Sequence, residues 1–137
     1  MALALAPHTV SGPASSHREE HLRHALDTLA LAAGAECAVL ADDDGLPLAA
    51  SSGLDPEQVL AYAAASAHLV AAAEGAQRLT RHLLPPELSL ALSSERRLHV
   101  HTLRSPAGRL ALALVGAHPP ERAPLTALSR ALQSVLA

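Results

Sequence analysis

The chain of 137 residues is predicted to be a single α+β domain, with one central antiparallel sheet and helices on its faces. Three observations predict this class. The length suits one domain, short strand-like segments follow one another with short turns, and segments of helical periodicity lie before, between and after them. The predicted order is helix, two strands, helix, three strands, helix, which differs from the regular alternation of a parallel nucleotide-binding fold.

The N-terminal part contains a tail and then a first helix. Residues 1–15 are predicted to be a flexible tail, because proline, serine and glycine are frequent there, and residues 16–137 are predicted to form the folded domain. Ser16 and Glu19 match a capping box, a pair of side chains that bond backbone N–H groups at a helix start. Apolar residues then recur at helical spacing up to Gly34, where we expect the helix to end.

Two short apolar segments, residues 37–41 and 46–51, are separated by a turn that ends in Asp44 and Gly45. An Asp-Gly pair between two such segments predicts a β-hairpin, because glycine accepts the positive φ of tight hairpin turns. Pro47 lacks the N–H that an inner strand needs. We therefore expect the second strand to lie at an edge of the sheet.

A long alanine-rich helix is predicted next. Asp55, Pro56 and Gln58 supply an N-cap, a first-turn proline and a capping-box partner, and the helical pattern continues to about His82. Its apolar part, residues 59–73, is shorter than the roughly 20 residues that span a bilayer, so we expect no membrane insertion. The small side chains along this helix would let another backbone approach closely.

Three further strands and a last helix complete the predicted domain. Leu88, Leu90 and Leu92 alternate with small residues, which places these leucines on one face of a third strand. Residues 98–103 and 109–115 form two more strand segments, and leucines recur at helical spacing near the C-terminus. The third strand contains neither proline nor charge, although sheet edges are usually blunted by such residues. If this strand is an edge, something else must cover it.

The composition excludes several classes of function. The chain has no Phe, no Trp and one Tyr, so it lacks the aromatic platform on which nucleic-acid bases stack. Its ten basic residues are all arginine and stand against thirteen acidic ones, for a net charge of −3, so nucleic acid is not expected as a partner. The single Cys37 can form no internal disulfide, which fits a reducing cytoplasm.

No residue pattern indicates catalysis, a cofactor or a metal. His99 and His101 share one strand face and could supply half of a zinc site, but no further ligands are placed beside them, and a helix-covered or solvated pair is favoured. For three other histidines, an exposed position on a helix is favoured over metal binding: His17, His21 and His24. The turn at residues 42–45 fails as a calcium loop, because Ser51 stands where the twelfth-position carboxylate is needed. We therefore predict no catalytic residue, no cofactor and no metal site.

Residues 38–53 consist of an apolar strand, then the turn Asp-Asp-Asp-Gly, then the segment Leu-Pro-Leu-Ala-Ala-Ser-Ser-Gly. The capped alanine-rich helix follows this segment. This pattern resembles the roadblock (dynein light chain) family, including its bacterial, MglB-like members, and the element order over residues 16–137 is similar too. The resemblance implies an α+β roadblock sandwich of the profilin-like kind, with a five-stranded antiparallel sheet of order 2-1-5-4-3. It also implies one long helix on one face of the sheet and two helices on the other.

The resemblance further implies a function. Roadblock proteins have no catalytic site of their own; they bind small Ras-like GTPases or serve as adaptors, and two copies pair through the long helices and the third strands. We therefore expect a cytoplasmic homodimer that regulates a small Ras-like GTPase, as activator or adaptor, in signalling of the polarity or motility type. Two alternatives stay open: an effector-free scaffold or regulatory subunit, and a small-molecule sensor of related architecture.

Candidate interface residues follow from this expectation. The dimer interface is predicted to contain Leu88, Leu90, Leu92, Ala61, Ala64, Ala65, His68 and Ala72. Contact with the GTPase is predicted at Arg78, Arg81, Arg96 and Arg97, to none of which we assign a catalytic role. His68 could equally be an ordinary helix residue. A core of leucine and alanine without large rings is light for this size, so burying the third strand and the long helix against a second copy would add apolar contact.

Overall fold

The computed structural model describes residues 13–81, 87–106, 108–118, 120 and 122–136. Its elements are α2 (Pro13–Ala33), β2 (Cys37–Ala41), β3 (Pro47–Ala50), α3 (Pro56–Thr80), β4 (Glu87–Ala91), β5 (Arg97–Ser105), β6 (Gly108–Gly116) and α4 (Arg122–Leu136). The strands form one antiparallel sheet in the order β3-β2-β6-β5-β4. The predicted element order and the predicted sheet order 2-1-5-4-3 are both confirmed.

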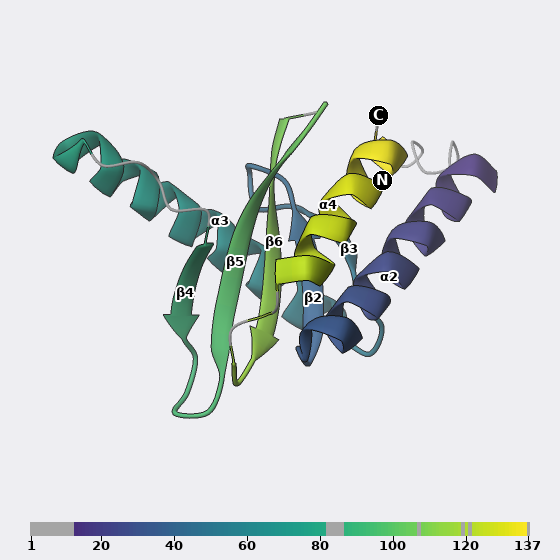
Figure 1. The fold of residues 1–137 in the computed structure, drawn as a ribbon, viewed down its shortest axis with the longest axis horizontal. Helices are drawn as coiled ribbons and strands as arrows, with labels where there is room; N and C mark the ends of the chain where they lie inside the picture. The colour runs from purple at the N-terminus through teal and green to yellow at the C-terminus, as the bar shows by residue number, and fades with distance from the viewer. Residues whose placement is uncertain (1–12, 82–86, 107, 119, 121, 137) are drawn as a thin grey trace, which may run out of the picture.

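Helices cover both faces of the sheet, with α2 and α4 on one face and α3 on the other (Figure 1). The alternation of side chains along β6 shows how a central strand serves both layers. Leu112 and Leu114 belong to the core under α2 and α4, whereas Ala111 and Ala113 belong to the core under α3. The predicted arrangement of one long helix opposite two others is therefore confirmed.

α2 begins earlier than the capping-box pattern predicts. It starts at Pro13, so Ser16 and Glu19 lie inside the helix and do not mark its start. Proline suits the first helical position, because its missing N–H would have no partner there in any case. The expected division between residues 15 and 16 thus falls within α2, and residues 1–12 lie outside the described part of the chain. The helix ends before Gly34, as predicted, and this glycine has a φ of 74°.

The turn between β2 and β3 is held by its own hydrogen bonds and by contact with α3. The carboxylate of Asp42 accepts hydrogen bonds from the backbone N–H groups of Asp44 and Leu46, at 2.9 and 3.0 Å. Gly45 has a φ of 83°, and a Cβ placed there would lie 3.1 Å from the Cβ of Ala67 on α3. Both the backbone conformation and the close approach therefore require glycine at this position.

β3 and β4 are the two edges of the sheet. The edge position of β3 confirms the prediction from Pro47, and a bulge in its pairing with β2 leaves Leu48 without an opposite residue. β4 ends at Ala91, so the prediction that Leu92 belongs to the strand is wrong. The N–H of Leu92 instead donates to the carbonyl of Arg96 at 2.9 Å, which closes the turn into β5.

α3 has the predicted N-terminus. The backbone N–H of Gln58 donates to the Asp55 carboxylate at 2.8 Å, and the Gln58 side chain accepts from the N–H of Asp55 at 3.1 Å. The helix ends at Thr80, and Arg81 caps it in the left-handed conformation with a φ of 62°. His82, the expected last residue, lies outside the described part of the chain. By length and composition α3 could cross a membrane, and 17% of its most apolar 18-residue window is buried.

Candidate self-association surface and partner-binding residues

α3 packs one side against the sheet and leaves most of the other side exposed. The buried side is marked by residues three or four apart: Ala63, Ser66 and Val70. Four of the predicted interface residues are exposed: Ala61, Ala64, His68 and Ala72. Ala65, predicted with them, is half-buried and packs against the core between α3 and the sheet. Within the described residues, a helix of apolar composition therefore presents small side chains to solvent along much of its length.

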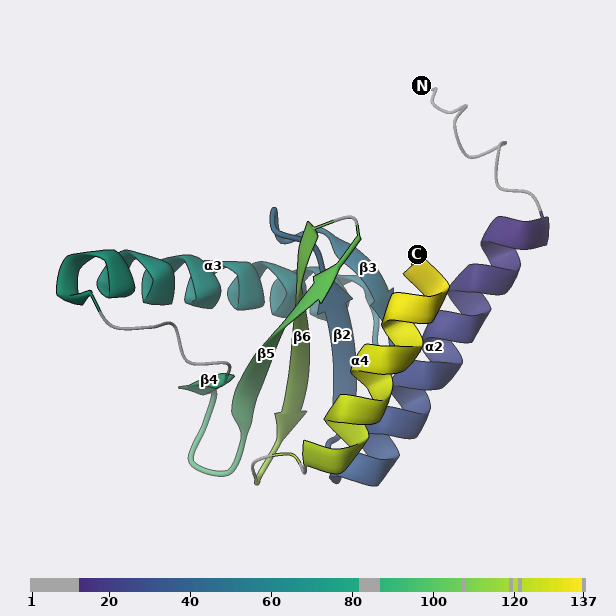
Figure 2. The same ribbon diagram turned by 45° about the horizontal axis from the view of Figure 1, so that its top comes forward.

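β4 supplies an open strand edge next to this helix. Leu88 is half-buried against the core under α3, whereas Leu90 remains 44% exposed and Leu92 is exposed to a similar extent. α3 runs past β4, and its C-terminal turns extend beyond this edge of the sheet (Figure 2). Leu79, in those last turns, is 88% exposed. Leu90 on β4, Leu92 just after it and the end of α3 therefore lie on the same side of the molecule.

The structure does not bring the four predicted partner-binding arginines together, although all four are exposed. Arg78 lies in the last turn of α3 and Arg81 caps that helix, whereas Arg96 and Arg97 lie where the β4–β5 turn enters β5. Figure 1 shows these two places at separate ends of the molecule. Arg96 also forms an ion pair with Glu36, with an N–O distance of 3.0 Å. A single arginine-lined site is therefore not formed within one copy.

An ion-pair cluster that the sequence did not indicate joins α3 to the sheet. Both terminal nitrogens of Arg109, at the start of β6, donate to the carboxylate of Glu74 on α3, and its Nε donates to Asp43 in the β2–β3 turn at 3.1 Å. The hydrogen bonds from Arg109 lower the pKa of Glu74, and those same bonds raise the pKa of Arg109. Because the three residues are far apart in sequence, no local spacing could have identified the cluster.

The two strand histidines are buried on the face that α2 and α4 cover. His99 and His101 stand opposite Leu114 and Leu112 in the pairing of β5 with β6, which fits the helix-covered interpretation. Within the described residues, no group of three or more His, Cys, Asp or Glu side chains could hold a metal ion. Cys37 is also buried, and this burial, with the nearby Glu36 carboxylate, raises the pKa of its thiol.

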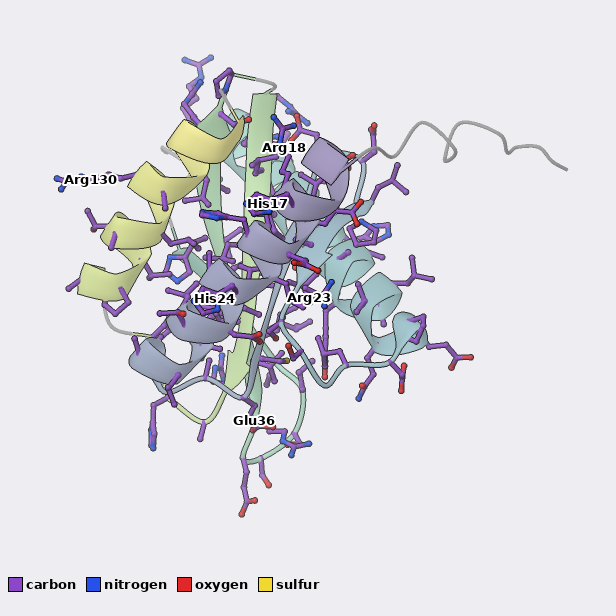
Figure 3. The ribbon with its side chains drawn as sticks, turned by 90° about the vertical axis from the view of Figure 1, so that its right-hand side faces the viewer. His17, Arg18, Arg23, His24, Glu36 and Arg130 are labelled. Atoms are coloured by element: carbon purple, nitrogen blue, oxygen red, sulfur yellow. The ribbon has the colours of Figure 1, made fainter. Side chains whose placement is uncertain are left out.

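The outer surface of α2 has a different character from that of α3. It carries exposed basic side chains, among them His17, Arg18, Arg23 and His24 (Figure 3). A groove of about 450 Å³ lies between α2 and α4, with His24 among its lining residues and alanine and leucine forming most of the rest. The exposed small residues of α3 and the exposed Leu90 of β4 belong instead to the half of the molecule that α3 covers.

Three exposed leucines near the start of α3 were not anticipated from the sequence. Leu46 and Leu48 flank Pro47 around the start of β3, and Leu60 lies in the second turn of α3. The pattern of the hairpin predicted a strand but did not indicate which of its side chains stay in solvent. The prediction that this strand lies at a sheet edge could have indicated exposed leucines, because an edge strand rich in leucine lacks the polar residues usual at such edges.

Comparisons with known proteins agree with this architecture. A model of the Roadblock/LC7 domain matches residues 23–83. MglB of Myxococcus xanthus is 18% identical, with a TM-score of 0.68, and the match covers 84% of this chain and 94% of that one. The gliding protein MglB of Thermus thermophilus is 20% identical, with a TM-score of 0.68 and coverage of 87% and 90%. A Roadblock/LC7 domain from Streptomyces avermitilis is 22% identical, with a TM-score of 0.69 and coverage of 83% and 96%.

No curated protein sequence matches the chain. The family-model match covers α3, the C-terminal half of α2 and the hairpin between them, and the solved structures share the sheet and the helices around it. Residues 23–83 therefore match the Roadblock/LC7 domain, and the chain has the fold of the bacterial roadblock proteins.

Proposed function

We propose that the chain works as a homodimer that binds and regulates a small Ras-like GTPase. The observation that carries this proposal is an apolar helix with little cover, next to an open strand edge. Only 17% of the most apolar window of α3 is buried, and Leu90 on β4 is 44% exposed. Contiguous apolar surface of this kind typically marks a protein interaction site.

A second copy of the chain would satisfy both features at once. Antiparallel pairing of two β4 edges would give their outward backbone N–H and C=O groups partners and would place Leu90 in a shared sheet. Because α3 extends beyond the β4 edge, its last turns would lie over the second copy (Figure 2). Ala72 and Leu79 would then lose contact with water, and the small side chains of the helix would allow close packing of the two helices.

The GTPase part of the proposal rests on the domain and on the proteins that share its fold. Residues 23–83 match the Roadblock/LC7 domain, and two of the similar structures are MglB proteins, one of them described as a gliding protein. We assign no catalytic residue to this chain. Its action would be that of a regulator, which binds the GTPase and either changes its rate of hydrolysis or holds it in place as an adaptor.

Two measurements test the proposal. Light scattering over a dilution series should give the mass of two chains, and a folded single chain at micromolar concentration would contradict the homodimer. A GTP hydrolysis assay with the small GTPase encoded nearest to this gene should then change on addition of the chain, if the chain acts as an activator. Binding without a change in rate would indicate an adaptor, and a dimer that binds no GTPase would favour the scaffold.

A further inference from the structure

The groove between α2 and α4 is an apolar surface on the sheet face opposite α3. The two helices lie side by side in Figure 1 and in Figure 2, and the groove between them has a volume of about 450 Å³. Its lining includes Leu29 and Leu128, which are 3% and 5% exposed and belong to the core under these helices. Because α3 covers the other face of the sheet, packing of α3 against a second copy would not fill this groove.

Short side chains leave the space between the two helices open. The rest of the lining consists largely of small residues that are exposed or half-buried: Ala25, Thr28, Ala32, Ala127 and Ala131. The volume of the groove falls within the range of about 300–1,000 Å³ that is usual for binding pockets. Of the lining residues that the structure describes, His24 alone can carry a charge. The groove therefore suits an apolar segment without charged side chains.

The first six residues of the chain have this character. They are one methionine, three alanines and two leucines, and no Asp, Glu, Lys or Arg precedes Arg18. Leu3 and Leu5 are two positions apart, so an extended chain would place both leucines on one side and the alanines between them on the other. Such a segment can bury two leucine side chains in an apolar groove without burying a charge.

These six residues are joined to the chain within reach of the groove. α2 begins at Pro13, and its part of the groove lining runs from His24 to Ala32, about 17 to 29 Å farther along the helix. An extended chain before Pro13 would carry Leu5 up to about 26 Å and Leu3 up to about 33 Å from that proline. A residue before proline disfavours the helical conformation, so the preceding chain need not continue the axis of α2 away from the groove.

We propose that residues 1–6 dock in the α2–α4 groove of their own chain, with the side chains of Leu3 and Leu5 against Leu29 and Leu128. Because the segment is joined to α2, its effective concentration at the groove is of the order of millimolar, and a weak apolar contact is enough to keep the groove filled. Another protein that uses this groove would first have to displace the segment. The inference concerns a single copy and does not depend on the proposed GTPase.

The test uses the full chain, isotopically labelled for NMR, with a nitroxide attached to the variant Ala6→Cys. Cys37 is buried and should react far more slowly, and mass spectrometry checks that one label is attached. A nitroxide broadens the signals of nearby protons, and reducing it gives the reference spectrum. We expect broadening of the amides of Thr28 and Ala127, which line the groove, and none at Ala61 on the exposed side of α3.

Substitutions in the segment test which of its sides is buried. In the labelled chain, Leu3→Ser with Leu5→Ser should lower the docked fraction about tenfold or more, because two buried leucines are lost. The matched control is Ala2→Ser with Ala4→Ser, which adds the same two hydroxyls on the opposite side of the extended segment. The control should keep the broadening. Equal broadening in the two double variants would contradict the proposed docking.

Substitutions in the groove test the other partner of the contact. Ala127→Glu places a carboxylate in the apolar groove and should abolish the broadening at Thr28. Leu31→Glu is the control, because Leu31 is 84% exposed on α2 and does not line the groove. Circular dichroism confirms that each variant is folded. Broadening that survives Ala127→Glu unchanged would contradict the assignment of the groove.

A mixed sample separates docking within one chain from docking between copies. It combines isotopically labelled chains that carry no nitroxide with unlabelled chains that carry it. We expect no broadening of the groove amides in this mixture. Broadening there would show that the segment of one copy occupies the groove of another, which overturns the inference. Absence of broadening in the singly labelled chain as well would leave the groove open to a separate protein, and this result also overturns the inference.

Discussion

Replacing Leu90 by glutamate should break the proposed dimer. Leu90 is 44% exposed in the single copy, and full burial of a leucine stabilises by about 1.5–3 kcal/mol, so its remaining exposed part is worth about 1 kcal/mol. Two copies contribute, which gives about 2 kcal/mol. An unpaired carboxylate in the shared seam would add roughly 1–3 kcal/mol more. Together these losses, about 3–5 kcal/mol, weaken the dimer about 100- to 4000-fold.

The assay is sedimentation velocity or light scattering on Leu90→Glu and on the control Leu31→Glu over a common dilution series. Leu31 is more exposed than Leu90 but lies on α2, away from β4, so its variant should dimerise as the wild type does. Thermal unfolding followed by circular dichroism separates loss of the dimer from loss of the fold. An unchanged dissociation constant for Leu90→Glu would refute the assignment of β4 to the interface.

Three further experiments test the packing of the single copy. Glu74→Gln should reduce stability by about 1 kcal/mol at neutral pH, because it weakens the bidentate pair with Arg109. The pKa of Glu74 is lowered in the folded state, so the pair with Arg109 should stabilise the wild type above pH 4.5 and should stop doing so as the pH falls through the folded-state pKa. Equal acid unfolding curves for wild type and variant would contradict the pairing. Gly45→Ala should destabilise more than Gly53→Ala in urea unfolding, since both have positive φ but only the first meets a close neighbour on α3; equal losses would show that this contact yields freely. Cys37, buried and with a raised pKa, should react with a thiol reagent only as fast as the protein opens, and rapid native-state labelling at pH 8 would disprove its burial.

The sequence predicted the architecture because its local signals agree with the tertiary structure. The Asp-Gly turn, the proline in β3 and the capping box at Asp55 each specify a backbone geometry that the fold uses. The start of α2 was placed too late, because Pro13 is a suitable first residue and a capping-box pattern at Ser16 can also occur inside a helix. Leu92 was assigned to β4 because alternation alone does not mark where a turn closes.

The candidate site was predictable only in part. Exposure of Leu90 and of the small residues of α3 follows from periodicity and from the unprotected third strand. The ion pairs of Arg109 with Asp43 and Glu74 join residues 66 and 35 positions apart, so they depend on the fold and have no local pattern. The exposure of Leu46 depends on how the hairpin sits on α3, which is again a tertiary property.

The most direct test of self-association through β4 is amide hydrogen exchange of Glu87–Ala91, measured at several protein concentrations. If the β4 edges of two copies pair, the outward-facing amides of this strand should be protected at high concentration and should lose that protection on dilution. The amides of the central strand β6 should stay protected throughout. Rapid exchange of the outward β4 amides at every concentration, in a sample that circular dichroism shows to be folded, would contradict the proposed dimer.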